Sequence, residues 1–333
     1  MGFQSQEGQV GFKTQAEEGT YADPGTDGVF MRTRSGALGP NRELLIPDPE
    51  IGGNRDVPDA YLGAVAFVGD FEFYARTRSF ATLARAALGQ GTSEAEGTEG
   101  AHKHTITPAT GPLPWLSVEE AIGEGFDVFH YTDAKVNTLH LEAEANGYLM
   151  GTVGLIARLQ EAGHIKTAAP AVDVNPMIVG TNISILMGGI TLPARSFTFD
   201  LNNNLEDDDF RLGSFFLGGL VEKRREFTAS VSIRPEDSSL WRRAVYGDPS
   251  AVTPGGLVVK EDLAIVCETY EPAGGAILHA IKVAAPQVAL QPFEVDPSGD
   301  DIIEHDIDIQ FLRPDPAVDI ASIEVVNATT AIA

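Results

Sequence analysis

Carboxylate and imidazole side chains are the groups in this sequence that could do chemistry, and they gather in three places. These are His102 with His104, the run Glu206-Asp207-Asp208-Asp209, and the group Asp300, Asp301, Glu304, Asp306 and Asp308. The two histidines stand two residues apart in a polar stretch, and no further ligand follows at a spacing that suits a metal ion. We therefore favour surface loop histidines over a metal site.

The two acidic groups match known kinds of site only in part. The run at 206–209 lacks the spaced Asp/Asn, Gly and Glu pattern of a calcium loop, which favours a solvated hairpin tip. Asp306 and Asp308 have strand spacing and could pair as catalytic carboxylates, but the sequence places no aromatic platform for a sugar near them. We favour a solvated acidic strand face for these residues.

The sequence carries no other catalytic signature. It has no Gly-rich phosphate loop, no Gly-x-Ser-x-Gly motif and no His-Glu-x-x-His motif. Cys267, the only cysteine, lies in an apolar run and is expected to be a buried small side chain rather than a nucleophile. Trp115 and Trp241 are expected to anchor a core or an interface. We predict no enzyme, and no catalytic, cofactor-binding or metal-binding residue.

The balance of charge limits the possible partners. Among 333 residues, 48 are acidic and 23 are basic, which gives a net charge of -25. Such a chain is poorly suited to wrapping nucleic acid, because phosphate contacts need Lys and Arg. It could line a channel through which nucleic acid passes without adhering, or the charge could serve solubility alone. No apolar stretch approaches the roughly 20 residues of a membrane span, and the polar N-terminus does not resemble a signal peptide, so we expect a soluble protein made in a cytoplasm.

Alternation of polar and apolar residues predicts a mainly β fold with two short helices. Strands are expected at 62–73, 136–145, 148–158, 196–201, 226–233, 276–290 and 301–312. Helices are expected at 80–88, with Ser79 as N-cap and Gly89 as its end, and at 238–246, closed by Gly247. The remaining segments are expected to be an extended N-terminal arm at 1–28, a polar loop at 90–103 and a linker at 160–180.

Two segments resemble each other at a constant offset of 158 residues. The segments Phe71 to Gly89 and Ala229 to Gly247 both read as a strand, an arginine, a helix and a closing glycine. This shared order predicts two copies of one β-rich unit. We assign residues 1–28 to an N-terminal arm, 29–170 to the first unit, 171–315 to the second unit and 316–333 to a C-terminal tail.

The chain resembles the major tail tube proteins of long-tailed bacteriophages over about residues 19 to 312. The order and spacing of several segments carry the resemblance: Gly19-Thr20-Tyr21-Ala22, Gly69-Asp70-Phe71-Glu72-Phe73, Phe80-Ala81-Thr82-Leu83, His104-Thr105-Ile106-Thr107-Pro108 and Phe197-Thr198-Phe199-Asp200-Leu201. The resemblance implies β-sandwich or split-barrel units with one short helix each. Six units would close a ring whose inner strands form a continuous barrel, and the rings would stack into a conduit for DNA.

This family would make the protein a structural part of the virion tail, assembled in the host cytoplasm. Its partners would be copies of itself and the tape measure, tail terminator and distal tail proteins, with DNA passing through the lumen without specific binding. Glu142, Glu144, Asp306 and Asp308 are the candidate lumen-facing acids, because each lies on the polar side of an alternating strand. Two units in each chain would close the ring with three chains, which imitates a hexamer. The alternatives are six chains per ring, another virion component such as a baseplate or capsid protein, and a carbohydrate-binding or hydrolytic β protein.

Overall fold

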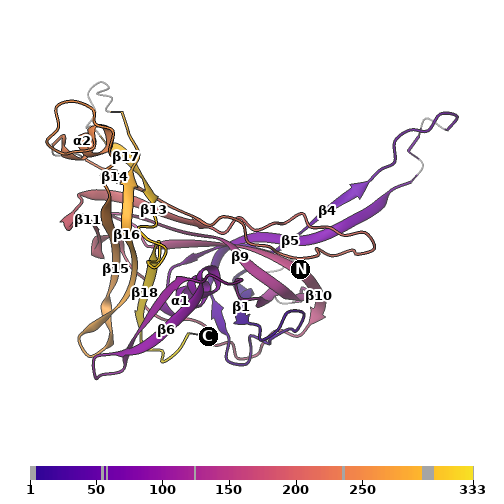
Figure 1. The fold of residues 1–333 in the computed structure, drawn as a ribbon. Coiled ribbons are helices and arrows are strands. Elements are labelled where there is room, and N and C mark those ends of the chain that lie inside the picture. Colours follow the sequence, from indigo (N-terminus) through magenta and orange to yellow (C-terminus); the bar gives the residue numbers. More distant parts are fainter. Residues whose placement is uncertain are drawn as a thin grey trace.

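The computed structural model describes residues 5–53, 56–57, 59–123, 125–234, 237–294 and 304–332. Over these residues the chain is mainly β, as the sequence predicts, and its strands pair in one antiparallel sheet that is consistent with a β-sandwich (Figure 1). The strands from the first part of the chain are β1 (Gln9–Thr14), β2 (Val29–Met31), β3 (Thr33–Gly36), β4 (Gly39–Leu45), β5 (Tyr61–Tyr74), β6 (Gly89–Glu96), β7 (Ala101–Pro108), β8 (Leu116–Ala121), β9 (Val128–Glu144) and β10 (Met150–His164).

The second part of the chain continues the same sheet. Its strands are β11 (Ile183–Met187), β12 (Ile190–Thr191), β13 (Ala194–Asn202), β14 (Glu226–Ile233), β15 (Glu261–Gly274), β16 (Ile277–Leu290), β17 (His305–Phe311) and β18 (Ser322–Asn327). The helices are α1 (Thr77–Leu88) and α2 (Ser239–Tyr246), with short 3-10 turns η1 (Ser5–Glu7) and η2 (Gly180–Asn182).

The strand pairings recur in the same order in the two parts of the chain. The first series runs β2–β1–β8–β9–β10–β5, with β3 and β4 on the far edge of β5. The second series runs β12–β11–β15–β16–β17–β14–β13. The helices occupy equivalent places in the two series. Helix α1 follows β5, the strand that pairs with β10, and helix α2 follows β14, the strand that pairs with β17.

Two further contacts join the series. β9 pairs antiparallel with β13, with Leu141 opposite Phe199, so the sheet continues from the first series into the second. β18 pairs with β7 on one edge and with β16 on the other. The segment assigned as a C-terminal tail therefore contributes a strand that connects both series.

Helix α1 lies against the apolar side of this sheet. Phe80, Leu83 and Leu88 are buried there together with Phe71 and Phe73 of β5. Burial of each of these five large apolar side chains stabilises the folded state by about 1.5–3 kcal/mol, so this region contributes a large part of the hydrophobic core. Helix α2 lies at the opposite end of the molecule from the N-terminal strands, near β14 and β17 (Figure 1), and its residues are only partly buried.

The start of α1 differs from the prediction. Ser79 lies inside the helix, which begins one turn earlier after Arg76. The backbone N–H of Ser79 donates to the buried carboxylate of Asp173 at 2.6 Å. An acid from a distant part of the chain therefore supplies the cap that we had assigned to a local serine. Gly89 ends the helix at φ 100°, as predicted, because a side chain in this left-handed conformation would be strained.

Two segments predicted to be irregular are strands. Residues 90–103 form the hairpin of β6 and β7 rather than a polar loop, and β7 gains a second partner in β18. The expected N-terminal arm contains β1, whose Val10 and Phe12 are buried between β2 and β8. Both strands depend on partners distant in sequence, which a local pattern does not reveal.

The hairpin of β4 and β5 projects far from the body of the molecule (Figure 1). We call its described residues 39–53, 56–57 and 59–64 the projecting hairpin. The apolar side chains of these residues are exposed on both faces of the hairpin, since Leu44 stands opposite Leu62, Leu45 stands opposite Tyr61, and all four are exposed.

Candidate assembly surfaces

One face of the sheet formed by β5, β10, β9, β13, β14 and β17 is polar. The register arranges its side chains in rows that cross the strands. From β9 to β17 the first row is Glu142, Thr198, Ser230 and Asp308, and the second is Glu144, Ser196, Ser232 and Asp306. A third row extends from β5 to β17 as Glu72, Thr152, His140, Asp200, Thr228 and Gln310. We call these three rows the polar face.

The four acids that we named as candidate lumen residues all belong to the polar face. Glu142 and Asp308 share the first row, Glu144 and Asp306 share the second, and all four are exposed. Members of a pair are three strands apart, which corresponds to roughly 15 Å at the usual strand spacing. They are thus spread over a surface, which suits a wall better than it suits a catalytic pair.

The reverse side of the same strands is apolar. Leu139, Leu141, Phe199, Phe227 and Ile309 alternate with the polar residues and are buried. Alternation along β13, β14, β17 and the last part of β9, from Leu139 to Glu144, therefore fixes which side chains face outward.

His140 is the one basic group in the three rows. Its Nδ1 lies 2.7 Å from the Asp200 carboxylate, and its Nε2 lies 3.6 Å from Glu142. The hydrogen bond with Asp200 raises the pKa of His140 above its ordinary value, with a smaller contribution from Glu142. The rows contain neither Lys nor Arg, so carboxylates dominate the charge of the polar face.

Arginines appear beside the polar face, at the ends of its strands. Arg234, after β14, donates to Glu304 at 2.6 and 2.8 Å, and Arg195 of β13 pairs with the same carboxylate. The hydrogen bond from Arg234 lowers the pKa of Glu304. Glu304 therefore ties the start of β17 to its neighbours. Arg76, the counterpart of Arg234 in the repeat, donates instead to the carbonyl of Asn175.

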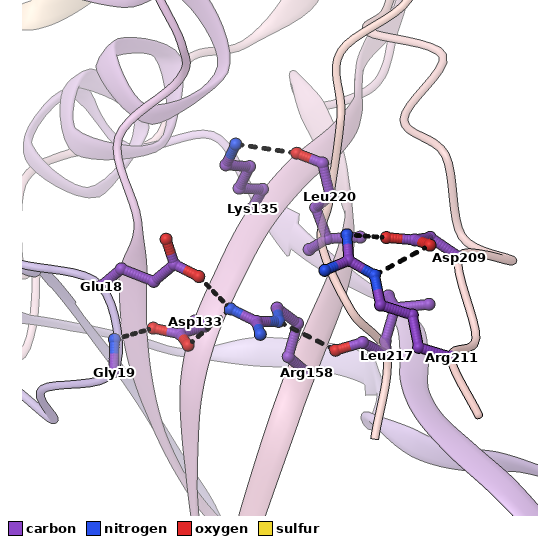
Figure 2. Close-up of polar contacts among 9 residues, drawn as sticks. All are labelled: Glu18, Gly19, Asp133, Lys135, Arg158, Asp209, Arg211, Leu217 and Leu220. Atoms are coloured by element: carbon purple, nitrogen blue, oxygen red, sulfur yellow. Dashed lines mark hydrogen bonds and ion pairs between the residues drawn. The ribbon is translucent and has the colours of Figure 1, made fainter. Parts of the chain in front are cut away.

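Residues 203–225 join β13 to β14 and fold back over the first series of strands; we call them the covering loop. Figure 2 shows how basic side chains hold it in place. Buried Lys135 of β9 donates to the Leu220 carbonyl at 2.9 Å and to Glu222 at 2.6 Å. Arg158 of β10 donates to the Leu217 carbonyl at 3.1 Å. Burial acts to raise the pKa of Glu222, but the hydrogen bonds to Lys135 and to the Leu113 N–H outweigh it and the pKa is lowered.

Asp133 extends the same polar cluster to the N-terminal segment. Its carboxylate accepts the Gly19 N–H at 2.7 Å and pairs with Arg158 at 3.1 Å, while Glu18 also pairs with Arg158 (Figure 2). Lys135 lies over the Trp115 ring, with its Nζ 4.1 Å from the ring centroid. Trp115 is thus an anchor between two parts of the chain, as expected.

The covering loop also completes a small apolar core. Leu205, Leu217 and Leu220 of the loop are buried against Ala66, Leu113 and Ile156 of the first series, with Trp115 beside them. The β5 backbone joins the contact, because the Val65 N–H donates to the Phe215 carbonyl at 2.8 Å. The second part of the chain is therefore fixed on the first by packing as well as by charge.

A family model described as phage tail tube protein matches residues 5–311. The chain belongs to the phage tail tube protein family. No curated protein shows significant similarity to it. The family confirms the resemblance found in the sequence and identifies a structural component of the virion tail. Because this family implies self-assembly, the surfaces described above are considered as candidate contacts.

The remaining candidate residues have structural partners in this tail tube protein. His104 is buried on β7 rather than exposed in a loop, because β6 and β18 enclose it, and its ring contacts Ser93 at 2.8 Å and Asn327 at 3.0 Å. Burial lowers the pKa of His104. Cys267 is buried, as predicted, and Trp241 donates to the Phe293 carbonyl.

The acidic run at 206–209 lies in the covering loop, where Asp209 pairs with Arg211 at 2.7 Å. Asp300 and Asp301 lie outside the described residues. Within the described ranges, no group of three or more His, Cys, Asp or Glu is arranged to hold a metal ion. Likewise, no described helix is long and apolar enough to cross a membrane.

Sequence reasoning missed three of the features that shape these surfaces. The strand at 62–73 is predicted and corresponds to β5, but the other strand of the projecting hairpin, β4, lies in a Pro- and Gly-rich stretch without clean alternation, where only the run Leu44-Leu45-Ile46 signals apolar exposure or pairing. The sequence gives no sign that Lys135 is buried or that Arg158 is partly buried, because basic residues on strands are ordinarily solvated.

Proposed function

We propose that this tail tube protein assembles into stacked rings that form a hollow tube, and that genomic DNA passes through the tube during ejection. The polar face is the observation that carries the proposal. A wide sheet with carboxylates, serines and threonines on one side and an apolar core on the other has the form of a channel wall. Assembly in the host cytoplasm, and contacts with tape measure, terminator and distal tail proteins, belong to the same proposal.

The polar face is proposed to line the lumen, with Glu142, Glu144, Asp306 and Asp308 exposed to the DNA. Carboxylates repel backbone phosphates, so DNA in contact with the wall gains no ion pairs that would hold it. Serine and threonine hydroxyls keep the wall hydrated between the charges. The genome can then slide without being bound.

The ring is proposed to contain three chains, each with two tube-like units. Support comes from the strand pairings, since the order β1–β8–β9–β10–β5 recurs as β11–β15–β16–β17–β14. The proposed units are residues 29–170 and 171–315, with β9 and β13 pairing at the junction between them; β1, from the proposed N-terminal arm, completes the first order. If one unit fills a sixth of the ring, three chains close it and leave fewer unpaired strand edges.

Electron microscopy of the purified protein tests the assembly. Negative stain is expected to show long hollow tubes, and mass measurement of isolated rings is expected to give three chains of 35.5 kDa. Protein that stays monomeric at high concentration would contradict the assembly. Six chains per ring would leave the tube intact but refute the claim that each chain supplies two units.

A further inference from the structure

The chain contains one complete junction between its two series of strands. At this junction β13 pairs with β9, and the covering loop packs on Leu113 and Ile156. Because the pairing order repeats, the second series has a place that corresponds to the one occupied by the covering loop. The described part of the chain puts nothing equivalent there.

The corresponding residues follow from the hydrogen bonding. Ile156, on β10, stands opposite Lys135 of β9. Leu312 directly follows β17, and its N–H donates to the carbonyl of Gln287 of β16. Leu312 therefore has the position in the second series that Ile156 has in the first. Leu113 precedes β8 by three residues, as Val258 precedes β15.

These paired positions differ in exposure. Leu113 and Ile156 are each 2% exposed beneath the covering loop, whereas Val258 is 60% exposed and its neighbour Leu257 is 85% exposed. Leu312 is half-buried. We call Leu257, Val258 and Leu312 the uncovered patch.

The projecting hairpin is the counterpart of the covering loop in the first series. Each connects the last strand of its series to the strand that enters the helix, since β4 leads to β5 and β13 leads to β14. Leu44 is 54% exposed and Leu62 is 58% exposed. A two-stranded hairpin with apolar side chains on both faces is only marginally stable by itself, so this segment is built to be covered.

The hairpin cannot reach the uncovered patch of its own chain. It projects from the side of the molecule opposite α2 (Figure 1), whereas Val258 lines a small cavity together with Arg243 of α2. We infer that the projecting hairpin of one copy packs on the uncovered patch of a second copy. The inference rests on the proposed function and specifies which surfaces of two neighbouring chains meet.

This contact is heterologous, because each copy gives its hairpin to one neighbour and receives a hairpin from the other. Repetition of such a contact closes a ring when the rotation suits. The contact between chains would then resemble the junction between the two series within one chain. Around the ring, junctions within a chain would alternate with similar junctions between chains.

Two complementary variants test the contact. Leu44→Asp with Leu62→Asp spoils the hairpin and leaves the patch intact, and Leu257→Asp with Val258→Asp does the reverse. Each variant alone is expected to stay monomeric while wild type assembles. An equal mixture is expected to give a complex of two 35.5 kDa chains, because one intact hairpin meets one intact patch and growth stops there.

The matched control is Leu44→Met with Leu62→Met, which keeps the apolar surface and is expected to assemble as wild type does. Thermal unfolding of every variant should match that of wild type, because all the substituted side chains are exposed. Size-exclusion chromatography with light scattering gives the masses.

Cysteine cross-linking supplies an independent readout. A chain with Leu44→Cys and Val258→Cys is expected to form covalent ladders between copies with a short bismaleimide. The native Cys267 is buried and should not compete.

The outcomes separate the inference from the proposed function. Tubes from wild type together with tubes from both Asp variants, or a mixture with no two-chain complex and no cross-link, would overturn the contact but leave the tube. Wild-type protein that never associates would overturn both.

Discussion

Glu120 lies on β8 with its side chain turned into the core, where the Leu38 N–H donates to it at 3.3 Å. Burial raises the pKa of Glu120 to about 7. A carboxyl whose folded-state pKa is raised stabilises the protein fully below its unfolded pKa, near 4.5. That contribution is lost as the pH rises through about 7.

The variant Glu120→Gln is therefore expected to be close to wild type in stability at pH 4.5 and more stable than wild type at pH 8. The difference is expected to be on the order of 2 kcal/mol, since wild type must ionise a buried group and the amide need not. Urea unfolding at both pH values measures it. Exposed Glu17→Gln is the control and should show no change between the two pH values; an equal response from both variants would contradict the account.

Lys135 is a second buried charge whose role can be tested directly. Lys135→Met keeps most of the apolar stem but leaves Glu222 and the Leu220 carbonyl without their donor. A loss of about 2–3 kcal/mol in the free energy of unfolding is expected, a little below the usual cost for a buried pair because Glu222 is partly exposed. Denaturant titration gives the value.

A control for the Lys135 variant lies in the covering loop, which Lys135 contacts. Lys223 pairs with Glu206 at 3.7 Å, and both side chains are exposed, so Lys223→Met is expected to change stability by less than about 0.5 kcal/mol. If Lys135→Met lowered the free energy of unfolding by as little as Lys223→Met, the hydrogen bonds of Lys135 would not be what holds the covering loop in place.

The start of α1 offers a test at the level of an element. Asp173 caps the helix through the Ser79 N–H and also accepts the Asn175 N–H at 3.0 Å. Asp173→Ala is expected to cost about 1–2 kcal/mol, because a buried helix terminus loses its acceptor. Ser79→Ala is expected to cost less, since its hydroxyl makes only a long 3.4 Å bond to the Arg76 carbonyl. Thermal unfolding compares the two; a larger loss at Ser79 would restore the local cap predicted from sequence.

Elements with strong local patterns were predicted well from sequence. β14 has the predicted bounds, because its alternation places Phe227, Val231 and Ile233 in the core without reference to any partner. α2 was found for a similar reason, since Gly247 ends it in the left-handed conformation. β6 and β4 escaped notice because nearly all of their side chains are exposed, which removes alternation from the sequence.

The polar face was predictable in part. Glu142, Glu144, Asp306 and Asp308 were each assigned to the polar side of a strand from local alternation. That they share one face depends on the pairings of β9 with β13, β13 with β14 and β14 with β17, which join residues more than 20 positions apart. No local rule gives those registers.

The charge of the polar face can be tested in whole virions. Phage whose tube carries Lys at positions 142, 144, 306 and 308 is expected to eject DNA more slowly than wild type at about 50 mM salt, and to recover much of the rate at about 200 mM. The physical reason is that Lys–phosphate contacts are screened by salt. Fluorescence of released DNA after receptor triggering gives the rate.

The control for this experiment reverses the charge of two acids outside the polar face. Asp207→Lys with Asp208→Lys changes exposed acids of the covering loop, outside the polar face, and is expected to leave ejection unchanged. Equal slowing by both sets would mean that net charge matters and the identity of the wall does not.

β18 has a consequence for how the protein folds as it is made. This strand follows all the other described strands in the sequence, yet it fills the gap between β7 and β16, and the Asn327 side chain donates to the Thr77 carbonyl at the start of α1. Until it arrives, two strand edges remain open and the first helix lacks one of its neighbours. A nascent chain that still lacks β18 is thus exposed to edge-to-edge aggregation. Pairing of β18 with both neighbours closes these two edges at once and removes this route to aggregation.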